Sequence, residues 1–470
     1  MSANPASAVS ALSRRKFLAP LALAQFICSF AGSNMNVMIN DITKDLDTTV
    51  QGVQAAITLF LLIMAILMIP SSKLSDRWGR KRCFTLGLVL YGIGALLSAV
   101  SPGLGVLILG NSVLEGVGTA FLIPPVYILT TLAFKDLTSR ARAFGVISGM
   151  AGAGAAAGPL IGGLITSAIS WRAAFVFQAL VVMTIVILAR RLVDPIPPDP
   201  SRPFDLLGAV LSAVGMFCVV LGILQADNDI ALMAVLLAVG AAFLLAFFLY
   251  IRARERAGKE PLLSTSLFRN RVSDLGLITQ NIQWLILMGV SFVVAVFLQT
   301  VRGYNAIETG VIFTAATLGV LASSLAAERL AKRYAQKALI VTGFVVTMAG
   351  IGLLLALVGA SSRVVAFAPG LLLIGLGLGV MLTPSVNIVQ SSFPEQDQGE
   401  ISGLSRSVSN LGSSLGTALV GSVLVSTLFS DTPNAAYAAA LIVMVGFGVV
   451  GLVAALLIPR GTAQGAAAPA

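Results

Sequence analysis

The feature that most constrains this chain is a series of apolar runs of about 20 residues, the length that spans a bilayer as a helix. Fourteen runs occur, and they lie near residues 17–39, 53–71, 83–101, 105–130, 141–166, 172–192, 206–225, 230–250, 275–299, 308–327, 338–359, 364–389, 401–426 and 436–458. They lack the alternating pattern of a transmembrane β-barrel, and backbone groups inside lipid must be hydrogen-bonded within helices. We therefore predict an all-α integral membrane fold of 14 transmembrane helices. Twelve helices with two re-entrant segments are the alternative.

The composition agrees with this class. Hydrophobic residues make up 57% of the chain and charged residues only 11%, against about 25% charged residues in a soluble domain. Arg14, Arg15 and Lys16 precede the first apolar run. That run is longer than the roughly 7–15-residue core of a signal peptide. We expect it to be retained as the first helix, and a cleaved signal is the alternative.

Basic residues are concentrated in alternate loops. If the N-terminus is cytoplasmic, 25 of the 30 Lys and Arg residues fall in cytoplasmic segments. The opposite side then has four, and a fifth lies within a helix: these are Lys44, Arg172, Arg302 and Arg363, and Arg406. This asymmetry follows the positive-inside rule. It predicts a multi-pass protein of the plasma (inner) membrane with both termini cytoplasmic, and it explains the net charge of +10 without a nucleic-acid partner.

Several classes of chemistry lack their residues. The chain has no histidine, and Cys28, Cys83 and Cys218 are too far apart for a metal or redox motif. No Walker loop G-x-x-x-x-G-K-[ST] and no buried carboxylate cluster occur, which argues against an ATP-driven pump and against a membrane enzyme. We expect no enzymatic activity, no cofactor and no metal.

The chain also repeats itself. KLSDRWGRK (73–81) matches RLAKRYAQK (329–337), and GVGTAFLIPP (116–125) matches GLGLGVMLTP (375–384). A set of four glycines recurs at a constant offset of 258 residues: Gly145, Gly154, Gly158 and Gly163 match Gly403, Gly412, Gly416 and Gly421. Repeated halves are a known transporter plan. We predict a six-helix bundle over 1–195, two inserted helices over 196–260 and a second six-helix bundle over 261–470.

A charged loop joins the second and third predicted helices, with the sequence SSKLSDRWGRKR (71–82). Gly79 permits a tight turn, and Asp76 is expected at a helix N-terminus, where the dipole favours a carboxylate. Arg80 can pair with a carboxylate on the facing loop. A basic anchor for lipid headgroups is the alternative interpretation of this loop.

The fifth predicted helix has glycines at fixed spacing around one proline: Gly145, Gly154, Gly158-Pro159 and Gly162-Gly163. Small residues four apart let helices approach closely, and proline bends a helix. Ordinary small-residue packing explains the glycines but not the Gly-Pro and Gly-Gly pairs. We expect a smooth contact along which the two halves can slide.

Both motifs resemble those of the major facilitator superfamily. The loop resembles its signature G-x-L-x-D-R-x-G-R-K/R at Leu74, Asp76, Arg77, Gly79, Arg80 and Lys81, with Ser72 in place of the first glycine. The helix resembles its antiporter motif G-x8-G-x3-G-P-x2-G-G at every fixed position. Segments 260–271 and 297–310 resemble the fourteen-helix subgroup, which exports drugs and other amphipathic compounds in exchange for protons. The resemblance implies that Asp76, Arg77, Gly79 and Arg80 form a gating loop and that the protein works by alternating access.

The chain departs from this subgroup at its usual charged positions. Ala31 replaces an aspartate in the first helix, Ser112 replaces an arginine, and Glu115 replaces a glutamine. Glu115 is the one acidic residue deep inside a predicted helix, and a carboxyl group there is a functional candidate by default. We expect it to bind a proton, a cationic part of a substrate, or both. A structural carboxyl bonded to Asn34 or Asn111 is the alternative.

Other polar residues at membrane depth are candidates for a cavity with apolar walls that suits amphipathic ligands, and each can equally bond two helices. They are Asn34, Asn36, Asn111, Ser112, Gln178, Gln280, Asn281, Gln283, Trp284 and Asn387. We predict a proton-coupled exporter of amphipathic small molecules that acts as a monomer in contact with membrane lipid. An uncoupled or lipid-moving transporter of the same fold is the first alternative, and a non-transporting membrane sensor is the second.

Overall fold

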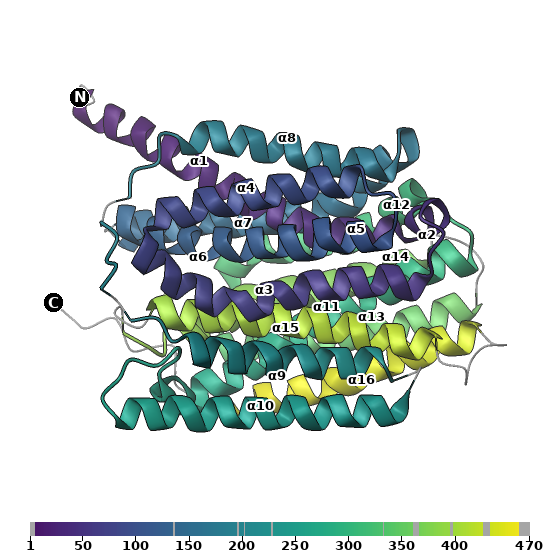
Figure 1. Cartoon of the computed structure of the whole chain (residues 1–470). Helices are drawn as coiled ribbons and strands as arrows, with labels where there is room; N and C mark the ends of the chain where they lie inside the picture. The colour runs from purple at the N-terminus through teal and green to yellow at the C-terminus, as the bar shows by residue number, and fades with distance from the viewer. Residues whose placement is uncertain are drawn as a thin grey trace.

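The computed structural model describes residues 5–134, 137–194, 197–201, 203–226, 229–331, 333–360, 366–394, 398–425 and 433–459. Within these ranges the chain is helical and has no strand. The long helices lie side by side along one axis (Figure 1). Each predicted apolar run corresponds to one of them: α1 (Pro5–Asn34), α3 (Val50–Trp78), α4 (Arg80–Ala99), α6 (Gly116–Ala133), α7 (Leu137–Ala168), α8 (Trp171–Ala189), α9 (Leu206–Leu224), α10 (Ile230–Arg256), α11 (Arg271–Val296), α12 (Ala306–Ala331), α13 (Gln336–Ala360), α14 (Phe367–Gln390), α15 (Gln398–Val425) and α16 (Pro433–Leu457).

Thirteen helical segments of the described chain are long and apolar enough to cross a membrane. The fourteenth long helix, α15, spans 28 residues but is not among these thirteen segments. It packs against α3 and α11 in the interior of the bundle. Serine hydroxyls inside lipid need a partner, and neighbouring helices supply it here. The predicted all-α membrane fold is therefore confirmed. The helix α15 belongs to it although its hydropathy alone does not identify it as a membrane span.

The pattern of neighbours occurs twice along the chain. In the first half α1 packs on α7, and α4 packs on α6 and α8; in the second half α11 packs on α15, and α13 packs on α14 and α16. The two halves meet at two long contacts, α3 with α15 and α7 with α12. We call these the α3–α15 seam and the α7–α12 seam. The residue limits of the two bundles remain a prediction.

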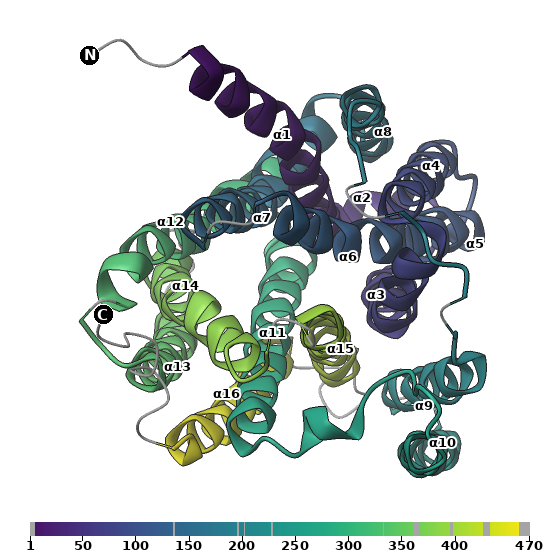
Figure 2. The same cartoon turned by 90° about the vertical axis from the view of Figure 1, so that its left-hand side faces the viewer.

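The two inserted helices lie at the side of the bundle. Viewed along the helix axes, α9 and α10 stand together beyond α3 and α15, whereas α11 is central (Figure 2). The helix α10 packs mainly on α9. Only 11% of its most apolar stretch is buried within the protein, compared with 72% for Arg271–Val301. Because the exposed residues are apolar, this pair presents its outer face to lipid.

Three of the spans are interrupted. The first predicted run is not one helix, because α1 ends at Asn34 and a 3-10 turn, η1 (Met35–Val37), leads into the short helix α2 (Ile39–Asp45). The fourth span begins with α5 (Leu104–Leu107) and a wide π-helical stretch, η2 (Ile108–Glu115). The ninth ends in a second π-helical stretch, η4 (Phe297–Val301). Such wide turns are often found at functional sites.

Candidate functional site

The signature loop forms a cluster of charges within the first half. Gly79 has a φ of 96° and makes the turn between α3 and α4, a conformation that favours glycine. Arg80 donates to Asp76 at 2.5 Å and lies 3.7 Å from Asp194, in the segment that follows α8. The pairing of Arg80 with a carboxylate is thus as predicted. The placement of Asp76 was wrong, because α3 continues through Trp78 and Asp76 lies in its last turn.

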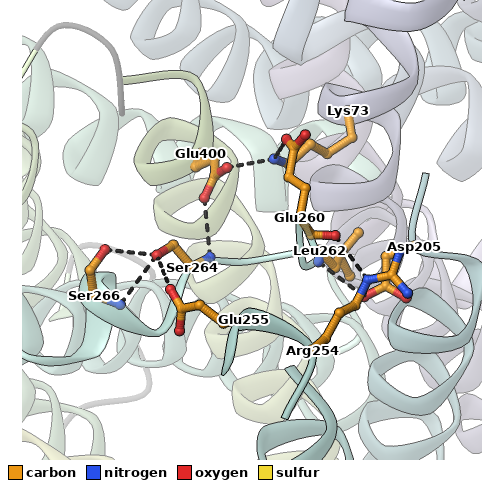
Figure 3. Close-up of polar contacts among 9 residues, drawn as sticks. All are labelled: Lys73, Asp205, Arg254, Glu255, Glu260, Leu262, Ser264, Ser266 and Glu400. Atoms are coloured by element: carbon orange, nitrogen blue, oxygen red, sulfur yellow. Dashed lines mark hydrogen bonds and ion pairs between the residues drawn. The ribbon is translucent and has the colours of Figure 1, made fainter. Parts of the chain in front are cut away.

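The charged contact between the two halves uses a different residue of that loop. Lys73, on α3, donates to Glu400 of α15 at 2.5 Å and to Glu260 at 3.0 Å (Figure 3). Glu400 also accepts from the backbone N–H of Ser264 at 3.2 Å. We call Lys73, Glu260, Glu400 and Ser264 the clasp. It joins both halves and the segment that leads out of the inserted pair, and none of its members was among the predicted site residues.

The inserted pair is tied to this clasp by a network of charged residues around the buried Asp205. Asp205 caps α9 and accepts from the backbone N–H of Leu262 at 3.1 Å and from the Tyr250 hydroxyl at 3.2 Å. Arg254 lies 3.8 Å from Asp205. Glu255, at the end of α10, accepts from Ser264 at 2.9 Å (Figure 3). These bonds fix the segment that carries Glu260, so α9 and α10 are mechanically connected to both halves.

The α3–α15 seam is held by side chains along its whole length. Near one end Gln54 donates to the backbone oxygens of Thr417 and Ala418, both at 3.2 Å. In the middle, Ser414 donates to the Thr58 oxygen at 3.0 Å and Ser407 to the Ala65 oxygen at 2.6 Å. The clasp closes the other end.

The α7–α12 seam is held by close backbone approach. A Cβ on Gly163 would lie 2.4 Å from the Ala306 oxygen, and a Cβ on Gly310 would lie 2.3 Å from the Pro159 oxygen. Neither glycine could gain a side chain without movement of backbone. Toward the other end of α7, a Cβ on Gly149 or Gly152 would meet nothing within 4 Å.

The other glycines of the motif face α1 rather than the second half. A Cβ on Gly154 would lie 2.2 Å from the Phe26 oxygen, one on Gly158 would lie 2.0 Å from Ser33 Oγ, and one on Gly162 would lie 2.0 Å from Asn34 Oδ1. The first glycine, Gly145, lies within α7. The motif therefore packs α7 between α1 and α12.

Glu115 is fully buried within the first half, at the end of the π-helical stretch. It accepts a hydrogen bond from Ser98 at 3.4 Å, and its second oxygen has no hydrogen-bond partner among the described residues. Its backbone and Cγ lie against Gly94 of α4. Among its neighbours, Tyr91 donates to Gln178 at 2.5 Å. Its hydrogen-bond partner is therefore Ser98, and the bond to Asn34 or Asn111 that was the alternative interpretation is not found in the described structure.

The predicted cavity residues are spread over several places. Ser112 donates to the Ala56 oxygen of α3, and in the second half Gln280 accepts from Ser405, Gln283 from Ser385, and Asn281 donates to the Val408 oxygen. Trp284 is half-buried and packs against the core, while Asn387 is exposed. Asn34, Asn111, Gln280 and Gln283 each keep a buried polar atom without a hydrogen-bond partner in the described part of the chain.

Asn36 belongs to a contact that closes the end of the bundle opposite the clasp. Gln299, on η4, donates to the Asn36 oxygen at 2.7 Å and accepts from the backbone N–H of Asn40 at 3.0 Å. The break after α1 frees these backbone groups, and a side chain from the second half satisfies them. Nearby, Ser167 accepts from the Ile307 N–H at 3.0 Å.

The comparisons with known proteins decide the family. The family model described as the Major Facilitator Superfamily matches residues 21–417 and, in a second match, residues 276–469. The chain belongs to the major facilitator superfamily.

Its curated relatives include drug exporters. It is 29% identical over 405 residues to the puromycin resistance protein pur8 of Streptomyces alboniger, covering 85% of this chain and 80% of that protein. It is 28% identical over 371 residues to the multidrug efflux pump LfrA of Mycolicibacterium smegmatis, covering 79% and 73%. The predicted resemblance to the drug-exporting branch is confirmed, and this superfamily member is a multi-pass transmembrane transporter.

A solved structure shows the same fold. The peptide transporter POT, in complex with sulfate, superposes with a TM-score of 0.69 over 95% of each chain, at 18% sequence identity. At that identity the likeness shows the fold alone.

One intramembrane residue had a visible signal in the sequence and was left out of the predicted site. Arg406 was noted as a cation inside a helix, without a role. In the structure it donates to the Tyr127 hydroxyl of α6, across the space between the halves. Its guanidinium lies 4.7 Å from the centre of the Tyr127 ring.

Proposed function

We propose that this protein is a proton-coupled exporter of amphipathic small molecules that works by alternating access in the plasma membrane. The names of its relatives as resistance and efflux proteins support export. The distribution of basic residues supports a cytoplasmic position for the clasp end and for both termini. One chain contains both halves of the pathway, which supports a monomer.

The observation that carries proton coupling is the isolation of Glu115. It is completely buried, and among the described residues one of its carboxyl oxygens has no hydrogen-bond partner and no cation forms an ion pair with it. A carboxyl group that lies inside the membrane and is not paired with a cation is a functional candidate. Proton binding and release at Glu115 would change the charge inside the first half, beside a π-helical stretch that can change its pitch.

The contacts between the halves support the gating part of the proposal. The end near Gln299 is bridged by the hydrogen bonds of Gln299 with the backbone of η1 and α2, while the clasp end is held by ion pairs between side chains. Opening toward either side requires one set of contacts to break. We propose that the Asp76–Arg80 cluster keeps the α3–α4 corner rigid while the clasp makes and breaks the contact between the halves.

The test is efflux of rhodamine 6G, an amphipathic cation, from cells that express the protein, with and without a protonophore. Glu115→Gln is compared with Asp274→Asn, which removes a carboxylate near the clasp end of α11. We expect the protonophore and Glu115→Gln each to abolish the efflux that the protein adds to the cells' own. Asp274→Asn should export the dye like the wild type. If Glu115→Gln still exports with full protonophore sensitivity, the proton site lies elsewhere.

The loss of the usual charged residues at Ala31 and Ser112 favours one second candidate, an uncoupled transporter of the same fold. In that case the wild type would equilibrate the dye, the protonophore would have no effect, and Glu115→Gln would transport normally. The same assay therefore separates the two.

A further inference from the structure

We infer that Arg406 is the recognition site for an anionic group on the transported molecule, so that the substrates include amphipathic organic anions. The inference rests on the proposed export function and names the substrate class for it. The evidence is the position of this cation inside the bundle and the absence of a charged partner for it among the described residues.

Arg406 lies at membrane depth. It is eight residues from Gln398, where α15 begins, which places it roughly 12 Å along the helix at 1.5 Å per residue. It is about 9 Å deeper than Glu400 of the clasp by the same rise. A charged residue at such depth is expensive and faces a partner, the bundle interior or a water-filled space.

The neighbouring residues fix the direction in which Arg406 points. Ser405 donates to Gln280 on α11, and Ser407 donates to the Ala65 oxygen on α3. Successive residues on a helix are about 100° apart, so Arg406 points between α11 and α3. Its contact with Tyr127 on α6 places it on the inner side of α15, between the two halves.

The partners of Arg406 are uncharged. Tyr127 accepts from Arg406 and donates to Gln25 of α1 at 3.3 Å, and Gln25 donates to Ser29 at 3.2 Å. No ion pair within the described residues includes Arg406. A guanidinium has five N–H donors, and the one hydrogen bond that Arg406 makes among the described residues leaves most of them available, since the side chain is only half-buried.

The rest of the interior does not balance this charge. Glu115, the deep carboxyl group, faces α4 inside the first half and bonds Ser98. A guanidinium binds carboxylate, sulfonate or phosphate through paired hydrogen bonds. The Tyr127 ring beside it offers an aromatic surface to the apolar part of the same ligand. Because Arg406 and Tyr127 come from different halves, one bound anion would contact both.

The test measures binding and transport separately, with three xanthene dyes of different charge. Fluorescein is an anion, rhodamine 6G is a cation, and rhodamine B has both charges. Binding to the purified full-length protein is followed by fluorescence anisotropy, and efflux is followed in expressing cells. The variants are Arg406→Gln, Arg406→Lys and the matched control Arg271→Gln, which removes an exposed charge at the start of α11.

We expect Arg406→Gln to weaken fluorescein binding by about tenfold or more, as loss of a charge-assisted contact does, and rhodamine B binding by less. Arg406→Lys should restore part of the loss. Rhodamine 6G binding should be unchanged or tighter in Arg406→Gln, and Arg271→Gln should match the wild type with all three dyes.

A purely structural cation–π contact predicts another result. Arg406→Gln would then weaken binding of all three dyes equally and lower the melting temperature, whereas Tyr127→Phe, which keeps the ring and loses only the hydroxyl acceptor, would stay close to the wild type in both measurements. That outcome overturns the inference, as does a wild type that binds no fluorescein. The inference would also be overturned if phosphatidylglycerol displaced fluorescein and phenyl phosphate did not, because Arg406 would then bind a lipid headgroup.

The two proposals can fail separately. If fluorescein binds through Arg406 but no dye leaves the cells, the export function fails and the anion site stands. If rhodamine 6G is exported and Arg406→Gln leaves the preference between the dyes unchanged, export stands and the anion site fails.

Discussion

The two seams join the same pair of bundles by different means. The α3–α15 seam is made of side-chain hydrogen bonds from Gln54, Ser414 and Ser407 and ends in the clasp of charges. The α7–α12 seam has its tightest contacts where Gly163 and Gly310 meet backbone oxygens of the opposite helix. One seam depends on groups that can exchange partners, and the other depends on the absence of side chains.

This difference has a mechanical consequence. A hydrogen bond or ion pair between side chains can break and form again with water or a new partner. A glycine contact has no direction to lose, so α7 and α12 can slide or rock with little change in polar bonding beyond the hydrogen bond from the Ile307 N–H to Ser167 at one end of the seam. We therefore expect the α7–α12 seam to act as the bearing between the halves and the α3–α15 seam to set which state is preferred.

The largest effect should come from adding a side chain to the α7–α12 seam. In Gly163→Val the new Cβ would lie 2.4 Å from the Ala306 oxygen, and overpacking against backbone costs about 1–3 kcal/mol or more. We expect efflux to fall more than tenfold and the melting temperature to drop.

The matched control is Gly149→Val, on the same helix. A Cβ there meets nothing within 4 Å, so the variant should transport at close to the wild-type rate. Equal losses in both variants would show that valine in α7 is harmful in itself and that the seam has no special part.

The second effect concerns the clasp. Lys73→Glu would place an acidic group beside Glu260 and Glu400, so we expect the halves to separate at this end. The pair of Lys73 with Glu400 is largely enclosed, with side chains 17% and 26% exposed, and we estimate a change of about 1–2 kcal/mol in the balance of states.

Spin labels at the exposed Arg82 and Arg271, in a background without cysteines, would measure the separation by pulsed electron resonance. Lys73→Glu should increase the long-distance population. The double exchange Lys73→Glu with Glu400→Lys should reverse most of the change in a Glu260→Gln background. A single variant that leaves the distance distribution unchanged would remove the clasp from the gating scheme.

The comparison of seams also shows what the sequence could and could not predict. Apolar run length and loop charge predicted the helical membrane fold, because both are local properties. The turn at Gly79 and the close packing of Gly158 followed from residue type. Lys73 and Glu400 are 327 positions apart in the chain, and no local pattern marks them as partners.

The interior site was harder to predict from the sequence for the same reason. Glu115 and Gln280 could be recognised as polar residues at membrane depth, but the direction in which each points depends on how helices rotate in the bundle. The residues predicted to line a cavity lie in several places in the structure, and their role in binding a substrate remains a prediction. Arg406 was visible as an intramembrane cation, and its meaning required the contact with Tyr127 on a distant helix.

A third effect would come from the hydroxyls in the middle of the α3–α15 seam. Ser407→Ala and Ser414→Ala each remove one hydrogen bond to a backbone oxygen of α3. Such bonds average about 0.6 kcal/mol in membrane helices. We expect a small loss of thermal stability and a transport rate within about twofold of the wild type by that measure. Ser392→Ala is the control, because the Ser392 hydroxyl follows α14 directly and bonds the Ile388 oxygen of that same helix. A loss of transport comparable to that of Gly163→Val would mean that the hydroxyls are part of the bearing.

The smallest effect should come from a contact that belongs to neither seam. Asp45 of α2 is bonded to Arg172 and Trp171 of α8, and the bond from Arg172 holds the pKa of its carboxyl below the usual 3.8. A lowered pKa stabilises the fold above that value, and the contribution is lost as pH falls through the lowered pKa. Because the Asp45 side chain is 46% exposed, solvent screening keeps the contribution small. We expect Asp45→Asn to lower the melting temperature of the purified protein by about 1 °C at pH 7, and this difference to shrink as pH falls below 3.8 and through the lowered pKa. A difference that persists unchanged at low pH would show that Asp45 acts through hydrogen bonding and not through its charge. A large loss of transport at pH 7 would show that the halves also depend on this corner, and that the two seams are not the whole connection between them.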